Sequence, residues 1–174
     1  MPASARQLLM AGVTSARDLG APLEASINVR NAINSGKLMG ATLYVSGPFI
    51  QHAPYPGTDF FRWGVTSVDD ARAKVNKIAD AGADVIKLID QDEMKEAEVA
   101  AVIDQAHKRG LPVVGHSHRP DEIRLGMKYG VDNFEHTGLA TAPEYPEDIM
   151  AMVRARTAQM NKGPFFWKIG RAHV

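Results

Sequence analysis

The sequence predicts an α/β fold with a parallel sheet, best explained as about five strands of a (β/α)8 barrel with their helices. Short apolar runs alternate along the chain with amphipathic segments, which is the pattern of βαβ units. No glycine-rich nucleotide-binding fingerprint follows any of these runs, which weakens the competing open, doubly wound sheet. Lysine or histidine lies in or just after three successive runs, and barrel enzymes carry their functional residues at the carboxyl ends of their strands.

The expected strands are the five apolar runs at residues 13–17, 42–46, 84–89, 112–115 and 131–134. The connection at residues 47–64 breaks the alternation, because it combines several prolines with His52 and shows no helical periodicity. We therefore expect a long loop there, and such loops are usually functional in compact domains.

Helices are expected between the strands where apolar side chains recur at spacings of three and four residues. A third helix should begin at Pro120, which is favoured at the first helical position, and end at Gly130. The recurring side chains of the first two helices are Ala71, Val75, Ile78 and Ala79, then Val99, Val102, Ile103 and Ala106.

Local signals mark the ends of these two helices. Ser67 and Asp70 have the spacing of a weak capping box at the start of the first helix. Gly82 and Gly110 stand where a left-handed C-terminal cap is expected.

Composition narrows the class of protein. The 174 residues are 45% hydrophobic, enough for one domain with a buried core. Twenty basic and twenty acidic residues cancel to a formal charge of +0, so a nucleic-acid partner is not expected. Without cysteine, any metal must be held by nitrogen or oxygen ligands. No apolar run approaches the roughly 20 residues of a membrane span, so no membrane partner is expected, and localisation stays open without a signal pattern.

The residues that carry chemistry are one lysine and three histidines. Lys87 lies in the middle of an apolar run, where a buried ammonium needs a partner, an exit to water or a chemical modification. His116 and His118 follow the run at 112–115, and His136 follows the next run. Imidazole is the commonest metal ligand, so histidines at the ends of neighbouring strands favour a metal site over isolated structural histidines.

Four stretches together resemble the imidazolonepropionase-like and Xaa-Pro or Xaa-Arg dipeptidase-like branch of the amidohydrolase superfamily. They are residues 12–20 (GVTSARDLG), 82–87 (GADVIK), 114–118 (VGHSH) and 130–136 (GVDNFEH). The resemblance implies that the predicted strands are the second to sixth of the barrel. It also implies that Lys87 is carboxylated by carbon dioxide and bridges two divalent metals, with His116 and His136 as further ligands.

The resemblance assigns lesser roles to other residues. His118 and His52 would lie on the substrate side of the site. Arg17 and Asp18 would form a structural ion pair beneath it. We expect His107, among polar residues near a helix end, to be a solvated surface residue.

The implied activity is metal-dependent hydrolysis of amide-type bonds in small molecules such as dipeptides, N-acyl amino acids, cyclic amides or esters. Two divalent metals, zinc first and manganese among the alternatives, would activate water and polarise the carbonyl. An oligomeric parent protein stays open.

The chain departs from the family pattern at both ends. The histidine pair of the first strand and the aspartate of the eighth strand have no counterpart in the sequence, so we expect an internal fragment that is inactive alone. Residues 1–167 would be the partial barrel. Residues 168–174 resemble a translated sequencing adapter, which would make them non-native and remove His173 as a ligand.

Two other interpretations stay open. In a class I aldolase, Lys87 would form a Schiff base with a carbonyl substrate, but this leaves His116 and His136 unexplained. The aldolase pattern also continues with Thr-Ser-Thr-Gly, whereas residues 88–91 here are LIDQ. The second alternative is a barrel fragment without catalytic activity.

Overall fold

The computed structural model describes residues 1–136 and 144–160, and within them the strands pair only in parallel. This confirms the predicted α/β class. The expected tail at 168–174 and His173 lie outside the described residues. The strands are β1 (Ser15–Asp18), β2 (Thr42–Val45), β3 (Phe49–Gln51), β4 (Arg62–Gly64), β5 (Ile86–Leu88), β6 (Val113–His116) and β7 (Asn133–Glu135). The helices are α1 (Pro2–Met10), α2 (Leu23–Asn34), α3 (Val68–Asp80), α4 (Glu96–Lys108), α5 (Pro120–Tyr129) and α6 (Glu147–Met160), with a 3-10 turn η1 (Gln91–Glu93).

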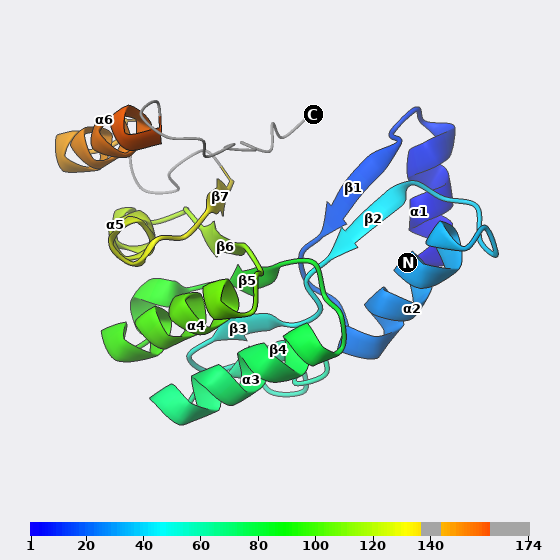
Figure 1. Ribbon diagram of the computed structural model, residues 1–174, viewed down its shortest axis with the longest axis horizontal. Coiled ribbons are helices and arrows are strands. Elements are labelled where there is room, and N and C mark those ends of the chain that lie inside the picture. The colour runs from blue at the N-terminus through cyan, green and yellow to red at the C-terminus, as the bar shows by residue number, and fades with distance from the viewer. Residues whose placement is uncertain (137–143, 161–174) are drawn as a thin grey trace.

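The strands form two sheets, a pair β1-β2 and a five-stranded sheet in the order β4-β3-β5-β6-β7. Figure 1 shows α1 and α2 beside the β1-β2 pair, whereas α3, α4 and α5 line the five-stranded sheet. Helices α3 and α4 pack against each other and against a core of aliphatic side chains. None of the described helices is both long and apolar enough to cross a bilayer.

The sheets separate where the chain bends between β2 and β3. Gly47 has a φ of +67°, which favours glycine, and a Cβ there would lie 2.6 Å from Cδ1 of Leu23 and displace that side chain. Pro48 follows and has no backbone N–H for a ladder. Strand β2 therefore ends, and the chain resumes as β3 alongside β5.

The prediction of one long loop at residues 47–64 is wrong at its two ends. Strand β3 begins two residues into this segment and β4 closes it. Each strand is only three residues long, too short to display a period of two. The irregular part is the segment between them, residues 52–61, which includes His52.

The three predicted helices are confirmed as α3, α4 and α5, and their caps follow the expected signals in part. Oγ of Ser67 accepts a hydrogen bond from the Asp70 N–H at 3.1 Å, but the Asp70 carboxylate accepts from Thr66 instead of Ser67. Gly82 and Gly110 have φ values of +86° and +71°, which confirms the left-handed ends.

An aspartate before β5 ties the start of that strand to the last residue of β2, and another before β7 ties the start of that strand to the first residue of β6. Oδ2 of Asp84 accepts the Val45 N–H at 2.9 Å, and Oδ2 of Asp132 accepts the Val113 N–H at 2.7 Å. Each aspartate also donates its own N–H to the carbonyl of the same partner. The amino ends of β5 and β7 are therefore held by structural hydrogen bonds, whereas His116 and His136 lie at or just after the carboxyl ends of β6 and β7.

Candidate metal centre

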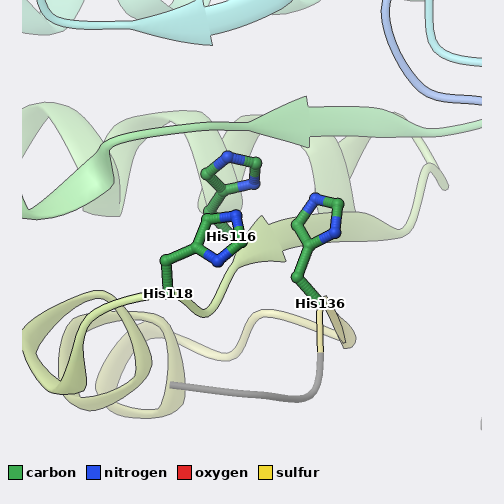
Figure 2. Close-up of side chains that lie close together, drawn as sticks. All are labelled: His116, His118 and His136. Atoms are coloured by element: carbon green, nitrogen blue, oxygen red, sulfur yellow. The ribbon is translucent and has the colours of Figure 1, made fainter. Parts of the chain in front are cut away.

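Three histidines converge at the carboxyl ends of β6 and β7. His116 is the last residue of β6, His118 lies two residues further on, and His136 directly follows β7. The ladder places His116 opposite Glu135, so the register of these two strands brings the segments after them side by side. Figure 2 shows the three imidazole rings grouped together.

The rings are close enough to share one ion. One nitrogen from each ring can be chosen so that all lie within 4.8 Å of one another. Ring centroids are 4.7 Å apart in each pair, with His118 and His136 stacked and His116 edge-on to both. Side chains of this kind offer neutral nitrogen ligands to zinc and related metals.

Lys87 occupies the middle of β5 and is only 2% exposed. Its Nζ lies 3.4 Å from Nδ1 of His116, within reach of a long hydrogen bond. Burial lowers the pKa of the Lys87 ammonium to about 8, an effect that the nearby carboxylates of Glu135 and Glu122 partly offset. The amine therefore has a larger neutral fraction near neutral pH than an ordinary lysine.

His116 is held neutral by the same surroundings. Burial first, then the charge of Lys87, lowers the pKa of His116 to about 3. Burial and Lys87 also lower the pKa of His136. Both rings therefore keep a nitrogen lone pair available across the physiological pH range, as a metal ligand must.

Arg17 pairs with Glu135 instead of Asp18. Nη2 of Arg17 lies 2.6 Å from Oε1 of Glu135, whereas Oδ1 of Asp18 accepts the N–H of Gly20 at 3.2 Å. The expected Arg17–Asp18 ion pair is therefore wrong, because consecutive residues of a strand point to opposite faces. Arg17 reaches across from β1 to the residue that precedes His136.

Gln91 holds the backbone of His116, a role that the sequence did not predict. It is fully buried, and its amide Nε2 donates to the carbonyl oxygens of His116, at 2.7 Å, and Glu122, at 3.2 Å. A glutamine shortly after a strand carries no distinctive pattern. Only the fold reveals that it holds the backbone of a candidate ligand.

The other predicted histidines lie apart from the cluster. His52 is exposed in the segment after β3 and is not part of the three-histidine group. His107 is exposed as expected, and its Nε2 lies 2.8 Å from Oδ2 of Asp132. His118, expected on the substrate side, lies in the group of three rings.

The backbone is strained on both sides of the centre. Asp90, just beyond β5, and His136 are the non-glycine residues with positive φ in the described chain, at +48° and +66°. Such conformations persist only where the surroundings enforce them, and they concentrate at functional sites.

A pocket of about 400 Å³ lies elsewhere, between β4 and α3, with Trp63, Lys74 and Lys77 in its wall. Neither Lys87 nor any of the three clustered histidines lines it. The chemistry of the ligand cluster therefore identifies the candidate site better than the size of a cavity does.

Comparison with known proteins supports the fold. No family model and no curated protein matches the chain. Among solved structures, a protein assigned as a prolidase from Bifidobacterium longum is 28% identical, with a TM-score of 0.72 over 86% of this chain and 38% of that one. A Xaa-Pro dipeptidase solved with methionine in its active site is 24% identical, with a TM-score of 0.74 over 89% of this chain and 43% of that one. An amidohydrolase is 22% identical, with a TM-score of 0.71 over 96% of this chain and 50% of that one.

The chain has an amidohydrolase-superfamily fold. It spans half or less of the length of these solved chains. The amidohydrolase likeness thus confirms the resemblance found in the sequence, while the ligand set and the reaction belong to the proposal that follows.

Proposed function

We propose that this chain is part of a metal-dependent hydrolase that cleaves amide-type bonds in small molecules, such as dipeptides or N-acyl amino acids. The observation that carries the proposal is that the buried Lys87 amine lies against the His116 imidazole, which in turn lies close to the imidazole of His136. A prolidase and a Xaa-Pro dipeptidase among the similar structures support the same class of bond.

In the proposed site, Lys87, His116 and His136 hold two divalent ions, with zinc as the first choice. The donor set fits, because the imidazoles are neutral and the lysine lies against one of them. Bound there, the ions would supply Lewis acidity toward a carbonyl and lower the pKa of water at the site. His118 stacks on the exposed His136, where it contacts substrate or adds a third imidazole. His52 is a second candidate for the substrate side.

Carboxylation would turn Lys87 from a cation into a ligand. The lone pair of neutral Nζ forms a C–N bond with the carbon of dissolved carbon dioxide, and one C=O electron pair moves onto oxygen. The nitrogen then loses a proton to water, which leaves a carbamate anion. The 2% exposure of Lys87 favours this outcome, because a buried ammonium is costly whereas a carbamate shared between cations is compensated.

We assign five barrel strands, the second to sixth of a (β/α)8 barrel, to β1, to β2 and β3 together, to β5, to β6 and to β7; β4 is a short addition beside β3. Support comes from the parallel ladders and from the Arg17–Glu135 ion pair. Strand β1 lies in one sheet and β7 at the edge of the other, so a 2.6 Å contact between them requires the sheets to curve toward each other, as in a barrel.

Zinc titration of the 174-residue chain by calorimetry tests the ligand set. His116→Ala and His136→Ala should each weaken zinc binding by more than roughly 100-fold, the upper range for residues that only support a ligand. His107→Ala, at an exposed histidine bonded to Asp132, is the matched control and should leave binding unchanged. Equal zinc affinity in all four proteins would refute the proposed site.

Carbon-13 NMR with labelled bicarbonate tests the carboxylated lysine. A carbamate resonance should appear with zinc, vanish in Lys87→Met and persist in the exposed-site control Lys37→Met. Its absence from the zinc-loaded protein would contradict this role of Lys87. Borohydride reduction with carbonyl substrates separates the aldolase alternative, since only a Schiff base would yield a stable adduct at Lys87.

A further inference from the structure

Ser117 is buried between the two strand ends that carry the histidines. It is 2% exposed and follows His116 directly. Its Oγ contacts the carbonyl oxygen of Glu135 and lies 2.7 Å from the carbonyl oxygen of His136. The β6-β7 ladder ends with His116 opposite Glu135, so this hydroxyl extends the connection between the strands one residue further.

The carbonyl that Ser117 engages belongs to a strained residue. His136 has a φ of +66°, which is uncommon for a residue with a Cβ. The same residue is exposed. Its ring nevertheless stacks on His118 with an interplanar angle of 9° and meets His116 edge-on.

We propose that Ser117 is a positioning residue that holds His136 in its left-handed conformation and thereby keeps its imidazole within the histidine cluster. This inference rests on the proposed metal site and extends it to a residue that binds no metal. A serine hydroxyl has a single proton, so it donates to one carbonyl at a time, and its two acceptors are the carbonyls of the peptide groups on either side of the His136 Cα. Loss of the hydroxyl would remove the donor that these part-buried carbonyl oxygens share and free the chain to relax toward an ordinary φ.

Zinc affinity of the complete 174-residue chain provides the first test. Ser117→Ala should weaken zinc binding about 10-fold to 100-fold, as for other residues that orient a metal ligand. The matched control is Ser26→Ala, because Ser26 is also buried and its Oγ donates to the Leu23 carbonyl at 2.8 Å. That control should leave zinc binding unchanged. Zinc affinity equal to that of the wild type in Ser117→Ala would overturn the proposal.

NMR of the zinc-free chain provides the second test and separates this inference from the metal site itself. Backbone chemical shifts and the N–H to Hα coupling of His136 report its φ, and both should change in Ser117→Ala but not in Ser26→Ala. If the wild type binds no zinc, the proposed function fails, and the positioning role is judged on these signals alone. Unchanged His136 signals would overturn it. Should Ser117→Ala not fold, Ser117→Cys, which keeps the volume but weakens the donor, is measured in the same way.

Discussion

Replacing Lys87 by methionine should stabilise the metal-free chain at neutral pH. Methionine has a similar length and no charge, so the substitution removes the buried ammonium without leaving a large cavity. The fold lowers the pKa of Lys87 from 10.5 to about 8. At about 1.4 kcal/mol per pKa unit, this corresponds to a cost of about 3 kcal/mol for keeping the amine charged. The lost contact with Nδ1 of His116 offsets about 1 kcal/mol, leaving a net gain of about 2 kcal/mol.

The pH dependence of this gain follows from the direction of the shift. Because the folded-state pKa is the lower one, the unfolded chain binds more protons between about pH 8 and pH 10.5. Wild-type stability attributable to Lys87 therefore rises with pH through this window. Below about pH 8 the amine is protonated in both states and the full cost is present. The advantage of Lys87→Met should accordingly be largest near pH 7 and disappear by about pH 10.5.

Urea denaturation at several pH values measures this difference in unfolding free energy. Chelator and carbon-dioxide-free buffer keep the lysine unmodified, and Lys37→Met at an exposed site serves as the control. A variant less stable than the wild type at pH 7 would refute the reasoning, as would a difference that stays constant from pH 7 to pH 10.5.

Two substitutions and one pH titration test the surroundings of the site. Gly126→Ala should cost about 1 to 3 kcal/mol in thermal or urea unfolding, because the new Cβ would lie 2.7 Å from the Phe134 ring; an equally stable variant would show that the ring can move away. Gln91→Leu should lower the unfolding free energy by about 1 kcal/mol, because it removes the two hydrogen bonds that the amide donates, and losing the unpaired Oε1 offsets part of that cost; unaltered stability would mean that water replaces the amide. The His116 ring should show no protonation step of its own between about pH 7 and pH 5, because its pKa is lowered to about 3. Between about pH 6.5 and pH 3 the unfolded chain therefore binds more protons than the folded chain, so His116 lowers the unfolding free energy as the pH falls through that range. A titration midpoint of His116 near 6.5 would contradict the burial argument.

The order of the elements was largely predictable because its signals are local. Apolar residues at spacings of three and four mark α3 and α4, and the proline and glycine that bound α5 act within one turn of the helix. Helix α1 was not predicted because its local signal is weak. Ala5 is the sole buried residue among its nine. A helix that buries little leaves a weak periodic signal.

The candidate site was predictable only in part. Lys87 was conspicuous because a charged residue inside an apolar strand violates the usual pattern, and His116 and His136 because each follows a strand. Serine and glutamine near strand ends are common in any protein. The roles inferred for Ser117 and Gln91 become visible only once their partners, residues distant in sequence, are placed beside them.

By itself, the sequence determined the α/β class, the five strands β1, β2, β5, β6 and β7, and the helices α3, α4 and α5. These properties follow from side-chain periodicity and from the shared direction of parallel strands. Only the tertiary structure decided that the chain bends at Gly47, that Arg17 pairs with Glu135, and that His118 joins the other two rings. Each of these depends on strand register and on how far the sheets curve, which are set by packing between segments far apart in the chain.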